Sequence, residues 1–209
     1  SFVSGDASDF DKFEAWARTV PETLRNPLYH WTAMELRRPF GIDTPLTPAS
    51  ARDVFGRCNE KLQQDGFTTM GLLAQFKVAV VCSTDDPVDS LEPHAKLAAR
   101  KDPVTQVYPT WRPDKSVMVE DLVAWTAWLE KLEDASGVSI GTWESLLEAL
   151  DKRHAFFHER GCRASDHGLE WIDSIPCTDA EAAELFSRLR KGQKLYAGEA
   201  NTFRSALLH

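Results

Sequence analysis

The hydrophobic pattern changes its period once along the chain, near Lys77. Before this point apolar residues recur every three or four positions, which is typical of amphipathic helices. After it, short β-branched runs such as "VAVVCS" at 78–83 alternate with helical stretches. A continuous apolar strand of this kind indicates burial on both faces of a parallel sheet. The pattern therefore predicts a helical region at 1–76 and a β/α region at 77–209.

Helix start signals predict four helices in the first region. Ser8 and Asp11 resemble a capping box, and Asn26-Pro27 and Thr47-Pro48 each place a proline where a helix begins. A short fourth helix is expected at 69–76. Nothing in this region has the alternation of a strand.

Three strands and their helices are predicted in the second region. The strands lie at 78–83, 104–110 and 162–165. The helices span about 88–100 and 119–160 and then continue from a T-x-x-E box at Thr178. Alternation of this kind is typical of an α/β protein with a parallel sheet.

Polar side chains follow each predicted strand at its carboxyl end. The ends of parallel strands meet at one edge of a sheet, and ligands of β/α proteins bind there. The sequence therefore predicts a ligand site at this edge. Its candidate residues are Asp85 and Asp86 after the first strand, Trp111, Arg112 and Asp114 after the second, and Asp166 and His167 after the third.

Arg112 is the strongest single candidate for ligand binding. A guanidinium can bind a carboxylate or a phosphate through two parallel hydrogen bonds, and a neighbouring Trp111 could shield that pair from water. The alternative is that Arg112 pairs with Asp114 and fixes a loop. The sequence leaves both interpretations open.

The acidic pair Asp85 and Asp86 and the imidazole of His167 each have a structural alternative. The carboxylates could bind a hard cation or transfer a proton, but one of them is more simply the N-cap of a helix that starts at Pro87. His167 could shuttle protons or could simply be satisfied by a neighbouring carboxylate.

Other catalytic patterns receive little support. His154 and His158 have the i, i+4 spacing of metal ligands, but the residues between them differ from a zinc-peptidase motif, so a solvated helix face is the better interpretation. The glycine-rich motifs for dinucleotides and phosphates and the esterase motif G-x-S-x-G are absent from the sequence.

Composition and charge narrow the classes of partner. The net charge of −8, from 32 acidic and 24 basic residues, argues against broad attraction for nucleic acid or an anionic membrane. Four widely spaced cysteines suggest a reduced protein, and no apolar run reaches the length of about 18 residues that spans a bilayer. A cytoplasmic protein is expected.

The number of strands predicts an incomplete assembly. A (β/α) barrel needs about eight strands, and a sheet of three buried parallel strands would leave apolar edges open. We therefore expect the chain to be part of a longer protein or to rely on another chain.

Four long stretches of the sequence are distinctive when taken together and in order: "GDASDFDKFEAWARTVPETLRNPLYHWTAMELRRPFGI", "STDDPVDSLEPHAKLA", "PTWRPDKS" and "GCRASDHGLE". Together they resemble the uronate isomerase (glucuronate isomerase) family of the amidohydrolase superfamily. The resemblance runs from about Gly5 to the last residue.

The resemblance implies a fold and an activity. The fold is a distorted (β/α)8 TIM-type barrel with a helical insertion, of which this chain would hold the insertion at 1–76 and about three barrel units at 77–209. The activity is the interconversion of D-glucuronate with D-fructuronate, and of D-galacturonate with D-tagaturonate, through an enediol. A small uronate sugar is the expected ligand, and a homo-oligomer is expected.

The resemblance also assigns roles to the candidate residues. Arg112 matches the family's substrate-contacting arginine, and Trp111, Asp85 and Asp86 join it as substrate-binding candidates. Asp166 and His167 are the candidates for catalysis.

The metal ligands of the family, expected to hold zinc or another divalent ion, would lie outside this chain. The chain alone is therefore predicted to be inactive. The alternatives are a metal-dependent amidohydrolase-type hydrolase and a non-catalytic helical interaction module.

Overall fold

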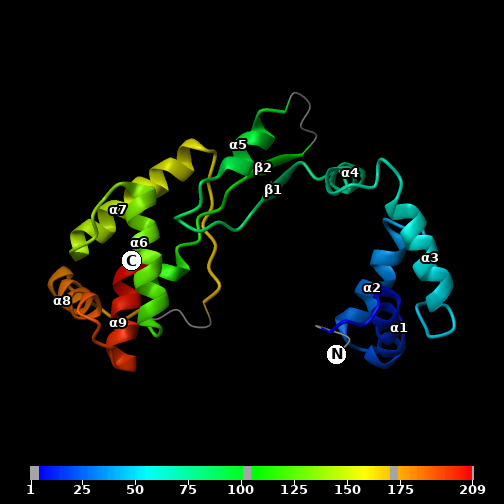
Figure 1. The fold of residues 1–209 in the computed structure, drawn as a ribbon, viewed down its shortest axis with the longest axis horizontal. Helices are drawn as coiled ribbons and strands as arrows, with labels where there is room; N and C mark the ends of the chain where they lie inside the picture. Colours follow the sequence, from blue (N-terminus) through cyan, green and yellow to red (C-terminus); the bar gives the residue numbers. More distant parts are fainter. Residues whose placement is uncertain (1–4, 101–104, 170–173, 209) are drawn as a thin grey trace. The chain divides into compact units, whose positions relative to one another are not determined.

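The chain divides into two compact units, Ser1–Val78 and Ala79–His209. The structure, a computed structural model, describes residues 5–100, 105–169 and 174–208 (Figure 1). The division lies beside Lys77, where the hydrophobic period changes.

The first unit is helical, as the sequence pattern predicts. Ser8 Oγ accepts a hydrogen bond from the Asp11 backbone N–H at 3.2 Å, and the Asn26 side chain caps the second helix through the Leu28 N–H at 3.0 Å. Both start signals are therefore confirmed. The elements are α1 (Asp9–Thr19), the 3-10 turn η1 (Val20–Thr23), α2 (Pro27–Arg37), α3 (Ala51–Leu62) and α4 (Thr69–Gln75).

The third helix begins later than the Thr47-Pro48 signal predicts. The Thr47 N–H donates to Ser50 Oγ at 2.9 Å, and this hydroxyl donates to the Pro45 carbonyl at 2.7 Å. These bonds hold 48–50 in a turn, so α3 starts at Ala51. The core of this unit consists of Ala17, Val20, Leu36, Ile42, Leu46, Ala51 and Val54.

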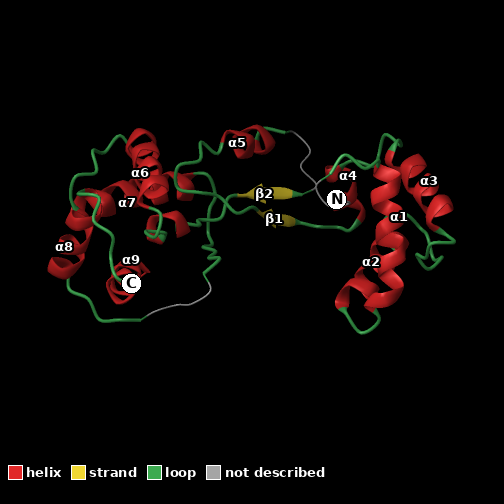
Figure 2. Cartoon of the chain, turned by 60° about the horizontal axis from the view of Figure 1, so that its bottom comes forward, coloured by secondary structure: helices red, strands yellow, loops and turns green. Residues whose placement is uncertain are grey.

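The second unit contains a parallel pair of strands, shown in yellow in Figure 2. They are β1 (Val80–Cys82) and β2 (Gln106–Tyr108), both shorter than predicted. Residue 104, the predicted first residue of the second strand, lies outside the described residues. The prediction that the first strand is buried on both faces is wrong for this chain, because Val80 is 52% exposed. Among the described residues the sheet has two strands, too few to bury such a strand.

The predicted third strand at 162–165 is reduced to a single bridge. Ser165 pairs in parallel with Trp111, and Trp111 pairs in parallel with Asp85. The expected order of three neighbouring parallel segments is therefore kept at their carboxyl ends, although the third is too short to count as a strand.

Helices make up most of the second unit. The predicted long helical region at 119–160 is two helices, because Gly137 ends the first with φ +66° and Thr142 caps the second. The Thr178–Glu181 capping box is confirmed. The elements are α5 (Glu92–Ala98), the 3-10 turn η2 (Asp114–Val117), α6 (Leu122–Ser136), α7 (Trp143–Glu159), α8 (Asp179–Arg190) and α9 (Ala197–Leu208).

The main core of this unit lies among α6, α7, α8 and α9. It includes Trp125, Leu129, Leu132, Leu146, Phe186 and Phe203. This helical core supports the strand ends from one side through η2, which contacts both α6 and α9.

Gly161 positions the segment that leads to Ser165, and replacing it should be costly. Its φ of +92° is strained for any other residue, and an added Cβ would lie 2.7 Å from Tyr108 Cδ1. We expect Gly161→Ala to lower the free energy of unfolding of the intact protein by about 2 kcal/mol or more in a urea titration. Gly141→Ala is the control, since its Cβ would meet nothing within 4 Å. Equal effects of the two variants would contradict the prediction.

Glu199 joins α9 to α8 in a pH-dependent way. Its carboxylate accepts from Arg188 Nη1 at 2.7 Å and Nη2 at 3.0 Å and from the Tyr196 N–H at 2.8 Å. The hydrogen bonds from Arg188, and then that from Tyr196, lower the pKa of Glu199 below its ordinary value. The stability from this contact is therefore present above the ordinary glutamate pKa and lost as the pH falls through the lowered pKa.

The test compares the thermal midpoints of the intact protein and Glu199→Gln from about pH 7 to about pH 3, the range that spans glutamate titration. We expect the variant to melt lower at neutral pH and the difference to shrink in acid. Glu130→Gln, at an exposed position of α6, is the control. A difference that does not change with pH would contradict the assignment.

Candidate functional site

Backbone hydrogen bonds join the three predicted strand ends side by side. The Arg112 N–H donates to the Asp85 carbonyl, and the Asp166 N–H donates to the Trp111 carbonyl, both at 3.0 Å. The Trp111 N–H donates to the Ala164 carbonyl at 3.0 Å. These bonds bring the ends at Asp85, Trp111 and Asp166 to one edge, as predicted.

Arg112 is half-buried at this edge and lies between two carboxylates. Its Nη2 is 3.1 Å from Asp166 Oδ2, and its Nε is 3.5 Å from Asp114 Oδ2. Nε is buried without a hydrogen-bond partner. With 35% of its side chain exposed, Arg112 can still be reached by a ligand. The pairing with Asp114 does exist, so Arg112 both contacts a loop residue and remains accessible.

Trp111 packs away from this charged group. Its ring meets Phe157 and His154 edge to face, with centroids 5.1 and 5.3 Å apart. Successive residues of an extended segment point to opposite faces, which explains why Trp111 and Arg112 diverge. The contacts favour a packing role for Trp111 against α7; its contact with substrate stays a prediction.

Asp166 and His167, on the third segment, contact Arg112 and Asp114, respectively. Asp166 Oδ2 also accepts from Thr84 Oγ1 at 3.2 Å. His167 Nδ1 lies 2.7 Å from Asp114 Oδ1. The structural alternative for His167, a neighbouring carboxylate, is therefore observed, and it leaves Nε2 as the atom available to a ligand.

Asp85 is buried and held by its own surroundings. Its Oδ2 accepts from Ser83 Oγ at 2.7 Å and from the Thr110 N–H at 3.1 Å. His94 Nε2 lies 3.7 Å from Oδ1 and 2.7 Å from Ser83 Oγ. These bonds tie the end of β1 to the end of β2, so the Asp85 carboxylate contributes chiefly to the shape of the edge.

Asp86 faces the opposite direction, toward the helical core. Its Oδ1 accepts from Trp128 Nε1 at 2.9 Å, and Lys115 Nζ is 2.9 Å from its Oδ2. Both carboxylate oxygens are thus engaged. Substrate binding by Asp85 and Asp86 stays a prediction, but their contacts favour supporting roles.

The prediction that one of these aspartates caps the following helix is wrong. That helix, α5, begins at Glu92 rather than near Pro87, and its N-cap is Leu91 with φ +55°. Asp86 Oδ1 instead accepts from the Val88 N–H in a local turn at 3.1 Å. The two carboxylates bond instead to Ser83, Thr110, Trp128 and Lys115, which lie outside this helix.

Arg153, which was not among the predicted site residues, fixes the loop after β1. This buried guanidinium donates to the carbonyls of Pro87 and Asp89, both at 2.7 Å, and of Ala135 at 3.2 Å. Burial lowers the pKa of Arg153. An arginine in line with the apolar positions Leu146, Ala149 and Phe157 of one helix was the signal for a buried cation.

The described residues do not fit a resident metal ion. They contain no group of three or more His, Cys, Asp and Glu side chains able to hold one. His154 and His158 are exposed on α7, which confirms the solvated-face interpretation.

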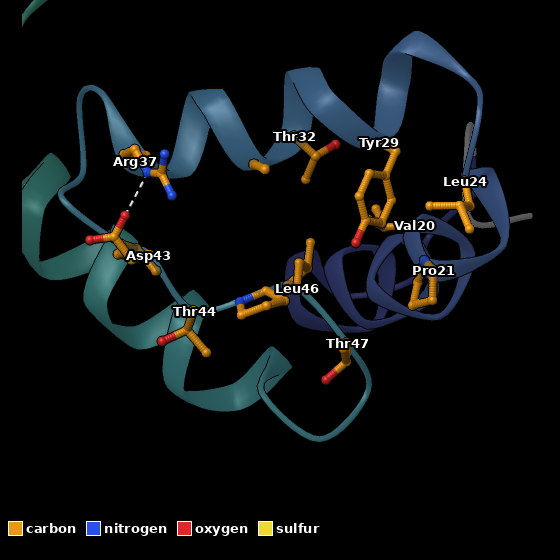
Figure 3. A pocket seen from close by; sticks show the side chains of 13 residues that line it. Val20, Pro21, Leu24, Tyr29, Thr32, Arg37, Asp43, Thr44, Leu46 and Thr47 are labelled. Carbon is orange, nitrogen blue, oxygen red and sulfur yellow. Dashed lines mark hydrogen bonds and ion pairs between the residues drawn. The ribbon is translucent and has the colours of Figure 1, made fainter.

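A separate pocket of about 320 Å³ lies within the first unit (Figure 3). Val20, Tyr29, Thr32 and Leu46 are among the residues that line it. The cation at its wall, Arg37, is already paired with Asp43. None of the predicted site residues lines this pocket, so it is not the predicted strand-end site.

The arrangement at the strand ends is that of β/α proteins, whose ligand sites lie at the carboxyl ends of parallel strands. The particular family follows from comparison with known sequences: the family model described as glucuronate isomerase matches residues 1–209. The chain belongs to this family.

Known relatives agree with this family and are longer than the chain. A uronate isomerase from Cellvibrio japonicus is 46% identical over 208 residues, covering 99% of this chain and 44% of the relative. One from Bacteroides thetaiotaomicron is 46% identical over 203 residues, covering 97% and 43%. The chain thus spans less than half the length of these relatives.

Solved structures resemble the fold over nearly the whole chain. The crystal structure of uronate isomerase from Thermotoga maritima matches with a TM-score of 0.92 and 31% identity, over 99% of this chain and 45% of that one. Glucuronate isomerase from Caulobacter crescentus matches with a TM-score of 0.89 and 28% identity, over 97% and 42%. In the described part of the chain, no helix combines the length and the apolar character needed to cross a membrane.

Proposed function

We propose that the intact protein containing this chain is a uronate isomerase. It would interconvert D-glucuronate with D-fructuronate, and D-galacturonate with D-tagaturonate. The observation that supports this most directly is the half-exposed Arg112 at the joined strand ends, in a chain of the glucuronate isomerase family. A uronate differs from a neutral sugar by its carboxylate, and a guanidinium is the side chain best suited to bind that group.

Arg112 would bind the substrate carboxylate through its accessible nitrogens. Its present partner Asp166 is 41% exposed and accepts a further hydrogen bond only from Thr84 among the described residues. Asp166 can therefore exchange its contact with Arg112 for one with a substrate hydroxyl. The more deeply buried Asp114 would stay in place.

Isomerisation moves a proton between C2 and C1 of the sugar, so it needs a group that takes and returns this proton. Asp166 and His167 are the candidates on this chain. They are consecutive residues, Asp166 pairs with Arg112, and His167 contacts Asp114, the other carboxylate beside Arg112. Because Asp114 holds His167 Nδ1, Nε2 would be the nitrogen that meets the substrate.

The rest of the intact protein would complete the fold and the site. We propose a distorted (β/α)8 barrel of the amidohydrolase kind, with 1–76 as a helical insertion and 77–209 as barrel units. A divalent metal, zinc by the family resemblance, would be held by residues outside this chain. The protein would be cytoplasmic and homo-oligomeric, and this chain alone would be inactive.

The test is an assay of the purified intact protein with D-glucuronate and with D-galacturonate, following formation of the keto acid. Turnover of either uronate, with none for the neutral aldoses D-glucose and D-galactose, is the expected result. Absence of turnover with both uronates, before and after incubation with zinc, would overturn the proposal. The isolated 209-residue chain serves as the comparison and should show no turnover.

A further inference from the structure

We propose that Asp114 is a positioning residue that fixes the Arg112 guanidinium and the His167 imidazole relative to each other. One carboxylate would thus set the geometry of both the substrate-binding cation and a candidate proton-transfer group. The inference rests on the proposed function, but its structural part can be tested without turnover.

Asp114 is the most deeply buried acid that touches the Arg112 group, with 7% of its side chain exposed. Its two oxygens divide their contacts. Oδ1 lies 2.7 Å from His167 Nδ1, while Oδ2 accepts from the Gly168 N–H at 2.7 Å and lies 3.5 Å from Arg112 Nε. A buried carboxylate with this set of partners has little freedom to move.

These contacts are tertiary and do not serve the local helical turn. Asp114 is the first residue of η2, but this turn has no side-chain cap, and its N-cap position is Pro113. His167 and Gly168 are more than 50 residues further along the chain. The carboxylate therefore joins the second strand end to the third. A helix-capping carboxylate would instead have bonded to residues within its own turn.

The contact with Asp114 sets which nitrogen of His167 faces a ligand. An ionised carboxylate only accepts hydrogen bonds, so Nδ1 must carry the proton that lies between them. Nε2 then points away from Asp114 as the atom that can accept a proton or a hydroxyl. A carboxylate behind an imidazole is a general way of fixing its tautomer and orientation.

Gly168 allows the backbone to approach this group closely. A Cβ at this position would lie 3.1 Å from Arg112 Nη2 and 3.5 Å from Asp114 Oδ2. The absence of a side chain thus lets the Gly168 N–H reach Asp114 without displacing Arg112. Three consecutive residues therefore contact this pair: Asp166 contacts Arg112, His167 contacts Asp114, and the Gly168 backbone approaches both closely.

The test is a double-mutant cycle in the intact protein, measured as kcat and KM with D-glucuronate. We expect Asp114→Asn to lower kcat/KM by about 10- to 100-fold, because a hydrogen-bonded charge partner is lost. Asp114→Asn is combined with Arg112→Met in one cycle and with His167→Gln in a second cycle. Each cycle compares the double variant with its two single variants and the wild type. Because Asp114 acts on both residues, Asp114→Asn should cost less in the Arg112→Met and in the His167→Gln background than in the wild type, so that neither double variant shows the full product of its single losses.

Multiplicative losses in both backgrounds would overturn the proposal, because they would mean that Asp114 acts independently of Arg112 and His167. Asp121→Asn is the matched control. This exposed aspartate caps α6, a position where asparagine serves equally well, so its kinetics should be unchanged. Asp114→Glu, which restores the charge, should recover part of the loss in KM.

Two further measurements keep the proposal testable. If Asp114→Asn does not give folded protein, Asp114→Glu replaces it, since it keeps the charge but moves the carboxylate; its loss should likewise be smaller in the Arg112→Met background. If the wild-type protein turns over no uronate, the proposed function fails separately. The crystal structure of Asp114→Asn then decides: displaced Arg112 and His167 side chains support the inference, and unmoved ones overturn it.

Discussion

Replacing Arg112 by methionine in the intact protein should lower kcat/KM for D-glucuronate by about 100- to 1000-fold. Methionine keeps much of the length of the side chain but removes every donor and the charge that the substrate carboxylate would meet. Because Arg112 would bind a group remote from the reacting C1 and C2 atoms, much of the loss should be in KM. Steady-state kinetics at saturating and subsaturating uronate separate the two parameters.

The matched control is Arg190→Met. Arg190 is exposed in the last turn of α8, and its side chain has no hydrogen-bond or ion-pair partner among the described residues, so the kinetics of Arg190→Met should match those of the wild type. Arg112→Lys should lie between wild type and methionine, since lysine keeps the charge but not the planar pair of donors. A change of less than about 3-fold for Arg112→Met would mean that the carboxylate is bound elsewhere, since a lost charge-assisted bond costs more than that.

Features that depend on neighbours in the chain could be predicted from the sequence. The caps at Ser8, Asn26 and Thr178 act within three residues, and the structure forms each of them as expected. The order of three aligned strand ends also follows from alternation alone, because consecutive β/α units place their carboxyl ends at one edge. This is why Arg112, Asp166 and His167 were correctly predicted to lie together.

Features that depend on distant partners could not be predicted. Local rules make an aspartate before Pro87 a helix cap, but Thr110, Lys115 and Trp128 bind these two carboxylates instead. A hydrogen bond between residues 25 or 42 positions apart leaves no trace in a local pattern. The division of contacts at Asp114 is of the same kind, since both of its hydrogen-bond partners come from another strand end.

Strand length and burial depend in the same way on what lies outside a segment. The run at 78–83 has the composition of a doubly covered strand, yet its described pairing is confined to Val80–Cys82. The apolar composition of this run suits a strand that is covered on both faces. The remaining strands of the proposed barrel would supply that cover. The exposed Val80 is consistent with a surface that other segments of the intact protein cover.

Replacing Arg153 by methionine should cause the largest loss of stability, about 3 kcal/mol or more. The guanidinium donates to the carbonyls of Pro87, Asp89 and Ala135, and its Cζ lies over the Phe156 ring, 4.2 Å from the centroid. Methionine fills much of the space but leaves all three carbonyls without this donor; the bond to Pro87 is buried, and the bonds to Asp89 and Ala135 are partly buried. A buried group left unsatisfied costs about 1 to 3 kcal/mol. A urea titration of the intact protein measures the difference.

The control for this variant is Lys152→Met, the neighbouring position. Lys152 is exposed on α7, and its one ion pair among the described residues is with Glu148 one turn earlier, a contact worth about 0.3 to 0.5 kcal/mol. Arg153→Lys should also be destabilising, because a single ammonium cannot reach all three carbonyls that Nε, Nη1 and Nη2 of the guanidinium reach. If Arg153→Met and Lys152→Met were equally stable, the loop at 86–89 would have to be held by Asp86 and its partners alone, and Arg153 would have no structural role there.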